Sequence, residues 1–197
     1  MLSFDPNEQS DRENYKLLIG SVIPRPIAFI TSVAEDGTVN AAPFSYFNAI
    51  SSKPPLLTVS VQRKSRKSKD TARNIREKKE FVVHIVDEEN VVEVNKTAAS
   101  LPADQSEIDL TDFTLIDSEA VSIPAVKQSK VRFECVLEQL VELGETDLII
   151  GRIVRFHIDE AIYQEGRISA EALKPVSRLA GTNYAKLGEI FSLKRPQ

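Results

Sequence analysis

The chain has 197 residues, of which 42% are hydrophobic and 27% charged, and its formal net charge is -4. This length and composition are typical of one folded protein with a substantial core, and we expect residues 1–197 to form a single domain. The negative charge argues against nucleic-acid binding, which needs a positive field. With 2 His and 1 Cys, the sequence excludes a zinc site of the Cys/His type and an intramolecular disulfide framework.

The N-terminal segment, residues 1–16, is acidic and polar, whereas a secretory signal needs a basic start and an apolar core. No apolar run approaches the roughly 18 residues that cross a bilayer as a helix. We therefore expect a cytoplasmic protein with no membrane partner. The solitary Cys135 lies in a strand-like segment and is expected to be a buried, reduced thiol.

The first half of the chain alternates strand patterns with helix patterns. Strands are expected over residues 25–34, 39–51, 55–62 and 81–86, and helices over residues 11–20, 70–80 and 89–99. In the first helix, Asp11 is the expected cap and Gly20 the expected end. Asp36-Gly37 is a strong hairpin signal between the first two strands. Residues 100–112 are expected to form a long surface loop.

The second half of the chain is dominated by two long strand patterns, residues 131–143 and 147–159, joined by a turn around Gly144. In the first, Val131, Phe133, Cys135 and Leu137 alternate with Arg132, Glu134 and Glu138. Strands outnumber helices, and short antiparallel turns join most neighbours. The sequence therefore predicts a mainly β fold, a closed or partly open β-barrel with peripheral helices.

The familiar catalytic motifs are absent. The sequence contains no GxSxG, HExxH, GxxxxGK[ST] or GxGxxG, and with 7 Gly no phosphate-cradling glycine loop can be drawn. His84 and His157 lie in strand patterns, where we expect ordinary structural roles. Any hydride or electron chemistry therefore needs a bound cofactor.

A basic segment stands between the third strand and the second helix. Its cationic residues are Arg63, Lys64, Arg66, Lys67 and Lys69. Ser68, Asp70 and Thr71, which are residue types that cap helices, stand at the junction. A helix N-terminus carries unpaired N–H groups and partial positive charge, so this segment predicts a site for one phosphate monoester. The alternative is a flexible basic loop with an ordinary helix cap.

The strand expected over residues 39–51 has an unusual mixture of aromatic and polar side chains. Phe44, Tyr46 and Phe47 are interleaved with Ser45, Asn48 and Ser51. Because residues 55–62 connect this strand to the basic segment, we expect both to contact one ligand with a phosphate at one end and a flat, hydrogen-bonding ring at the other. FMN fits this description better than FAD or NAD, since one basic cluster matches one terminal phosphate. For either phenylalanine alone, core packing is the simpler interpretation.

Five segments follow one another in a familiar order, namely YKLLIGSVIPRPIAFITSVAEDGTVNAAPFSYFNAISSKPPLLTVSV, KDTARNIREKKEFVVHIV, VNKTAA, FECVLEQL and RLAGTNYA. Over residues 15–195 the chain resembles the flavin reductase-like, FMN-binding split-barrel family. It is most similar to the branch that contains the small component of nitrilotriacetate monooxygenase and flavoredoxin. The PRPIAF, NxAPFSxF and KDTxxNI pieces are the most specific.

The resemblance implies a homodimer of Greek-key-like split β-barrels, with FMN bound near the subunit interface. Carried over by position, the residues along the flavin ring and ribityl chain are Asn40, Ser45, Tyr46, Phe47 and Asn48. Those around the phosphate are Ser60, Arg63, Lys69, Asp70 and Thr71. Asn95, Arg178 and Tyr184 complete the pocket, from the same or the partner subunit. Ala180-Gly181 departs from the glycine pair common in the C-terminal motif.

The function that the resemblance implies is an FMN-dependent NAD(P)H oxidoreductase, a flavin reductase. NADH or NADPH is the expected transient donor, and a monooxygenase or another protein the expected electron acceptor. Hydride transfer needs no general base, so no catalytic residue is assigned. Two alternatives stay open: a non-catalytic FMN-binding electron carrier or flavin store, and an enzyme similar to pyridoxamine phosphate oxidase. The second alternative needs another basic cluster for the phosphate of its substrate.

Overall fold

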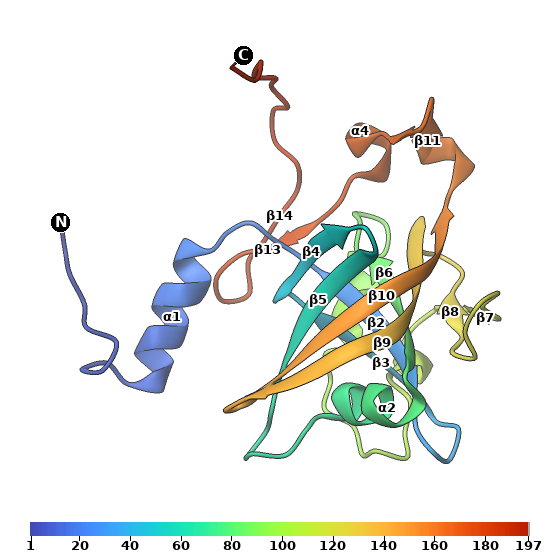
Figure 1. Ribbon diagram of the computed structural model, residues 1–197, viewed down its shortest axis with the longest axis horizontal. Coiled ribbons are helices and arrows are strands. Elements are labelled where there is room, and N and C mark those ends of the chain that lie inside the picture. The colour runs from blue at the N-terminus through green and yellow to red at the C-terminus, as the bar shows by residue number, and fades with distance from the viewer. Residues whose placement is uncertain (197) are drawn as a thin grey trace.

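The centre of the protein is a seven-stranded antiparallel sheet, which a computed structural model describes together with the rest of residues 1–196 (Figure 1). The strand order is β3-β2-β6-β9-β10-β5-β4. The bounds are β2 (Ala28–Val33), β3 (Val39–Phe44), β4 (Phe47–Ser52), β5 (Pro55–Gln62), β6 (Glu80–Ile85), β9 (Val131–Leu143) and β10 (Thr146–Ile158).

The sheet closes on itself because its two edge strands are consecutive in the chain. β3 and β4 lie at opposite edges, yet only Ser45 and Tyr46 separate them. A flat sheet of seven strands cannot be spanned by two residues, so the sheet curls into a barrel whose edges approach at this connection. There the backbone N–H of Ser60 donates to the carbonyl of Tyr46 at 2.8 Å. The single strand expected over residues 39–51 is thus wrong in one respect: it is broken where the chain changes edges.

Short helices and small strand pairs surround the barrel. Their bounds are α1 (Asp11–Ser21), β1 (Arg25–Pro26), α2 (Asp70–Lys78), α3 (Val91–Lys96), η1 (Glu107–Leu110), β7 (Leu115–Ile116), β8 (Ala125–Val126), η2 (Glu160–Ile162), β11 (Tyr163–Gln164), β12 (Arg167–Ile168), α4 (Ala170–Leu173), β13 (Ser177–Arg178) and β14 (Tyr184–Ala185). The mainly β architecture with peripheral helices is therefore confirmed. Within residues 1–196, no helix has the length and apolar character to cross a membrane.

The barrel interior holds the main core, and α2 closes one end of it (Figure 1). Ile30, Phe81 and Ile149 are fully buried on the inner face of the sheet. Ala72 and Ile75 of α2 pack into the same cluster, because they lie on one face of that helix. This packing fixes the start of α2 at the barrel rim, beside β3.

The first helix begins at Asp11, as expected, but its cap and its end each lie one residue away from the expected positions. Its cap is Ser10 rather than Asp11, since the Ser10 side chain and Glu13 form a reciprocal capping box. Gly20 lies inside the helix, which ends at Ser21. An exposed glycine in a last helical turn need not stop the helix when the backbone stays in the helical region.

The expected surface loop over residues 100–112 is more ordered than predicted, because it covers the edge of β3. Ser106 Oγ donates to the carbonyl of Val39 at 2.6 Å, and Glu107 Oε2 accepts the N–H of Ala41 at 3.1 Å. Glu107 and its neighbour Ile108 are buried. Side chains thus satisfy edge groups that would otherwise be free to pair with another strand.

The two histidines hold chain segments on the outer face of the sheet. His84 contacts the carbonyl of Phe29 through Nδ1 at 3.0 Å and accepts the N–H of Val126 at Nε2. Burial lowers the pKa of His84 to about 3, so its ring stays neutral. His157 lies 2.6 Å from the buried Glu134. Both roles are structural, as expected from the strand patterns.

Two glycines offer opposite tests of this packing. A Cβ at Gly151 of β10 would collide with the ring of the buried Phe81, so Gly151→Ala should lower the free energy of unfolding by about 1–3 kcal/mol. A Cβ at Gly20 of α1 would meet no heavy atom within 4 Å, so Gly20→Ala should raise it by about 0.5–1 kcal/mol. Urea unfolding measures both. A neutral Gly151→Ala would contradict the packing of Phe81 against β10.

Candidate functional site

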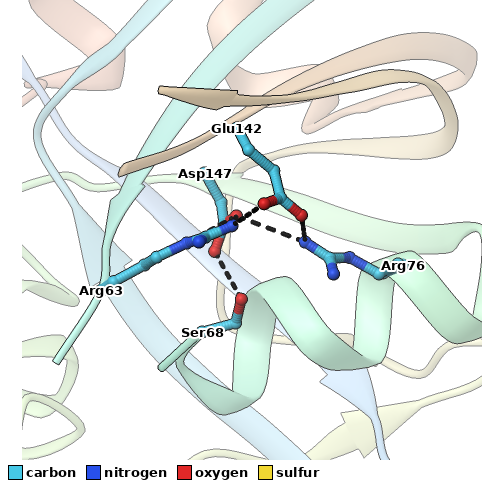
Figure 2. Close-up of polar contacts among 5 residues, drawn as sticks. All are labelled: Arg63, Ser68, Arg76, Glu142 and Asp147. Atoms are coloured by element: carbon cyan, nitrogen blue, oxygen red, sulfur yellow. Dashed lines mark hydrogen bonds and ion pairs between the residues drawn. The ribbon is translucent and has the colours of Figure 1, made fainter. Parts of the chain in front are cut away.

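A buried carboxylate organises the basic segment between β5 and α2 (Figure 2). Asp147 of β10 is fully buried, and its Oδ1 accepts from Arg63 Nε at 3.1 Å and Nη2 at 2.6 Å. Its Oδ2 accepts from Ser68 Oγ at 2.7 Å. Arg63 and Arg76 also contact Glu142, at 2.8 and 2.9 Å. Burial alone would raise the pKa of Asp147, but the hydrogen bonds and the arginine charges outweigh it, and the pKa lies below its ordinary value.

The start of α2 consequently has no side-chain cap. Lys69 is the N-cap residue and makes no capping hydrogen bond. Asp70 pairs with Arg73 at 2.6 Å, and Thr71 Oγ1 accepts from Asn40 Nδ2 at 2.8 Å. The ordinary helix cap considered for this segment is therefore wrong. The first-turn N–H groups have no side-chain acceptor among residues 1–196, which leaves them for an anion.

The five cations of the segment fall into two groups. Arg63 is neutralised by Asp147 and Glu142, and Arg66 lies 3.6 Å from Glu145. The three lysines, in contrast, have no carboxylate within 4.0 Å in the described part of the chain; they are Lys64, Lys67 and Lys69. All three line a cavity beside the helix start. The positive charge available to a ligand is thus that of the lysines.

We call this space the helix cavity; its volume is about 540 Å³. It lies between the start of α2, the edge strand β3 and the turn after α3. Its lining residues are Asn40, Ala42, Pro43, Phe44, Lys64, Ser65, Lys67, Ser68, Lys69, Asp70, Thr71, Thr97, Ala98, Ala99, Ser100, Leu101 and Glu107. Asn40, Ala42 and Phe44 alternate along β3, so one face of that strand forms a wall.

A second space adjoins the first, and we call it the hairpin cavity because the β13–β14 hairpin covers it. Its volume is about 250 Å³. Its lining residues are Tyr15, Ile19, Arg25, Ile27, Pro43, Phe44, Ser45, Tyr46, Asn95, Ala98, Arg178, Leu179, Gly181 and Tyr184. Pro43, Phe44 and Ala98 belong to both cavities, so the two form one groove along the barrel edge.

The hairpin itself is held by polar and cation–π contacts. Tyr184 Oη donates to Asn95 Oδ1 at 3.0 Å, and the Arg178 guanidinium lies 4.6 Å from the centre of the Tyr184 ring. These contacts link the C-terminal motif to α3. They place the hairpin at the far end of the groove from the lysines.

A family model described as a flavin reductase like domain matches residues 19–172. This chain belongs to the flavin reductase-like family. It is 58% identical to nitrilotriacetate monooxygenase component B from Bacillus cereus, whose crystal structure matches with a TM-score of 0.97 over 98% of both chains. It is 30% identical to the 2-nitrobenzoate 2-nitroreductase NbaA of Pseudomonas fluorescens, with a TM-score of 0.90 over 99% of this chain and 96% of that one.

The fold of this flavin reductase-like protein is the split barrel. A Shewanella frigidimarina structure with a split barrel domain matches with a TM-score of 0.86 over 100% of both chains, at 21% identity. The resemblance found in the sequence is therefore confirmed, and so is the expected fold. Membership of the family makes this protein a flavin-related oxidoreductase.

Most of the residues predicted for the cofactor site line the groove. The helix cavity gathers Asn40, Lys69, Asp70 and Thr71. The hairpin cavity gathers Ser45, Tyr46, Asn95, Arg178 and Tyr184. A larger hollow of about 920 Å³ beside β11 and β12 contains none of them. The basic segment thus lies along one groove with Asn40 of β3 and with Ser45 and Tyr46 of the β3–β4 connection.

Four predicted residues lie elsewhere. Phe47 packs against the barrel core, and Asn48 is exposed on β4. Ser60 lies in β5 and contributes its backbone to the edge connection. Arg63 is bound to carboxylates rather than turned to the helix cavity, because Asp147 approaches it from the neighbouring strand.

The structure also adds residues that sequence reasoning did not assign. Glu107 lines the helix cavity, but nothing in its local sequence marks it. Asn74 is buried beneath the helix start, where Nδ2 donates to Ser32 Oγ at 3.3 Å. Its position three residues after Thr71, on the same helix face, is a signal that identifies it. Arg25 of the PRPIAF segment lines the hairpin cavity.

The buried carboxylate of Asp147 yields a pH-dependent prediction. Asp147→Asn should lower the free energy of unfolding at pH 7 by about 3 kcal/mol, because it leaves a buried ionic network without its central charge. Since the folded-state pKa of Asp147 is lowered, its contribution is complete above its unfolded pKa of about 3.9 and disappears as the pH falls through the folded value.

Denaturant unfolding of wild type and variant from pH 7 to pH 2 measures this difference. We expect it to stay constant down to about pH 5 and to shrink below about pH 4. The exposed pair Arg152–Glu138 supplies the control: Glu138→Gln should change stability by less than about 1 kcal/mol. A difference for Asp147→Asn that is equally small, or unchanged at pH 2, would contradict the organising role of this carboxylate.

Proposed function

We propose that this protein is a flavin reductase that binds FMN and transfers hydride to it from NADH or NADPH. The observation that carries the proposal is the groove itself. One end presents the start of α2, which has no side-chain cap, and three lysines that have no carboxylate partner among residues 1–196. The other end is lined by tyrosines. A ligand with a terminal phosphate and a planar ring matches both ends.

The residues at the helix end suit a phosphate monoester. Lys64, Lys67 and Lys69 supply charge, and the first-turn N–H groups of α2 supply directed donors. The one acidic side chain in that turn, Asp70, is occupied by Arg73. Only one such lysine cluster lines the groove, which favours FMN over a flavin with a dinucleotide tail.

The remaining groove residues suit the rest of the cofactor. Asn40 would offer an amide to the ribityl chain, and Ser45 and Tyr46 would contact the ring. Bound flavin supplies the hydride chemistry. The chain's own task is to hold the ring with one face open to a nicotinamide, which requires orientation rather than a general base.

The proposal includes an electron acceptor and a second subunit. The Bacillus cereus relative is named as a component of a monooxygenase, and a partner oxygenase or another acceptor would receive reduced flavin or electrons here. A homodimer would cover apolar side chains on α1 and on the C-terminal segment, both of which extend away from the barrel (Figure 1). Exposed examples are Leu18 of α1, Val22 directly after it, Phe191 and Leu193.

Anaerobic mixing of the purified protein with FMN and NADH or NADPH tests the enzyme directly. We expect the flavin absorbance to bleach far faster than in protein-free solution. Lys67→Gln with Lys69→Gln should raise the FMN concentration needed for half-maximal rate at least about tenfold, because two charged phosphate contacts are lost.

Arg66→Gln is the matched control, since it removes one charge from the same segment at a residue paired with Glu145. It should leave the FMN requirement unchanged. Binding of FMN without any acceleration of its reduction would contradict the reductase and support a non-catalytic carrier or flavin store. Equal effects of the lysine and arginine variants would contradict the assigned phosphate site.

A further inference from the structure

Glu107 is a buried carboxylate with neither a cation beside it nor a full set of hydrogen bonds. The residue is 8% exposed. Oε2 accepts the N–H of Ala41 at 3.1 Å, and no other residue among 1–196 donates to this carboxylate. Within the same residues, no basic side chain lies within 4.0 Å of it. A carboxylate can accept about four hydrogen bonds, so most of this capacity is unused.

The second oxygen of Glu107 is open to the helix cavity. Side-chain oxygens that are both unpaired and sealed from water occur in the described chain at Tyr46, Asn74, Asp87 and Ser129, but not at Glu107. Oε1, to which no other residue donates, is therefore accessible. The space that Glu107 borders is the helix cavity. A ligand in that cavity would thus meet a free acceptor.

The other buried polar side chains of this cavity already have partners within the protein. Asn40 Nδ2 donates to Thr71 Oγ1 at 2.8 Å, and Thr97 Oγ1 donates to the carbonyl of Val94 at 2.7 Å. Buried polar groups are rarely left without a partner in folded proteins. The free oxygen of Glu107 is therefore a mark of a binding site rather than a property shared by the whole wall.

The surroundings of Glu107 do not neutralise it. Burial raises the pKa of Glu107, and the charge of Asp70 adds to this effect, whereas the N–H groups of Ala41 and of Glu107 itself oppose it. The lysines of the cavity lie beyond ion-pair distance. Donors supplied by a ligand would stabilise the charged form and replace the water that burial removes.

The hydrogen bond to Ala41 places the carboxylate between the two ends of the groove. Asn40 lies at the start of α2, whereas Phe44 borders both cavities. These two residues are separated by roughly 13 Å, at about 3.3 Å per residue of strand. Ala41 and Ala42 have no polar side-chain atom, so Glu107 supplies the polar group of this stretch.

A neutral hydroxylated chain is the ligand group that fits this position. A second anion would be repelled by the carboxylate, and a cation would be repelled by the lysines of the same cavity. Hydroxyl groups donate without carrying charge, and their hydrogen bonds to a carboxylate are stronger than those between neutral groups.

We propose that Glu107 is a specificity-determining residue, whose Oε1 accepts hydrogen bonds from the ribityl hydroxyls of the flavin. This assignment rests on the proposed function, because it takes a flavin as the ligand of the groove. Glu107 thereby selects a ligand whose phosphate and ring are joined by a polyol. The competing interpretation is that Glu107 only holds residues 100–112 against β3.

Riboflavin and lumiflavin separate the two interpretations, since they share the ring and lumiflavin has a methyl group in place of the ribityl chain. Fluorescence titration of the whole protein gives the affinity ratio of the two flavins. Glu107→Ala should lower the preference for riboflavin about tenfold, which is the size of one hydrogen bond to a charged group, and Glu107→Gln about threefold. A purely structural role would weaken both flavins equally.

Ser106→Ala is the matched control. It removes the neighbouring hydrogen bond that holds the same segment to the carbonyl of Val39, and Ser106 does not line the cavity. It should leave the ratio unchanged. If Glu107→Ala does not fold, Glu107→Gln decides, because its amide oxygen can still accept the N–H of Ala41.

A ratio that the Glu107 variants leave unchanged, or that Ser106→Ala lowers equally, would overturn the proposal. Tighter binding of FMN to Glu107→Gln with unchanged binding of riboflavin would also overturn it, since the carboxylate would then face the phosphate. Binding is measured without a nicotinamide. Flavin that binds with the expected ratio but is not reduced therefore contradicts the reductase and leaves the role of Glu107 standing, whereas no flavin binding contradicts both.

Discussion

The buried carboxylate of Asp147 is the constraint on which the site depends. It lies on β10, next to β5, and draws Arg63 and Ser68 toward the sheet from opposite ends of the basic segment. A serine that is bonded to Asp147 cannot cap α2. An arginine that is neutralised there cannot hold a ligand. One interaction therefore selects which groups remain available: the first-turn N–H groups and the lysines of the segment.

Closure of the barrel determines the course of the groove that starts at these groups. The chain leaves one sheet edge at Phe44 and enters the other at Phe47, so Ser45 and Tyr46 sit where the two edges approach. The groove follows the edge strand β3 from the start of α2 to this connection. An edge strand can form such a wall because no further strand covers it. Pro43, which would interrupt a central strand, is tolerated there for the same reason.

The sequence predicted those turns, strands and helices that are determined by turn residues and by the periodicity of neighbouring side chains. The Asp36-Gly37 and Gly144 turns, the long strand pair and α2 follow from turn chemistry and periodicity, and the structure contains all of them. The approach of the basic segment to the β3–β4 connection was also predictable, since one strand, β5, joins the segment to β4. The confirmed family resemblance added Asn95 and the C-terminal hairpin, which no local pattern connects to the groove.

What the sequence could not reveal depends on partners far apart in the chain. Ser68 is a residue type that caps helices. Its hydroxyl donates to Asp147 instead, and the local sequence cannot show this because Asp147 is 79 positions away. Glu107 reaches β3 from a segment that reads as a loop. Tertiary contacts, rather than local propensity, decide these cases.

The central claim is that the start of α2 and its lysines hold a phosphate, and riboflavin tests it most directly because it is FMN without that group. Calorimetric titration should show FMN binding at least about 30-fold more tightly than riboflavin, and the ratio should fall about tenfold in the Lys67→Gln, Lys69→Gln variant. Equal affinities for the two flavins, or a ratio that the variant leaves unchanged, would contradict the account.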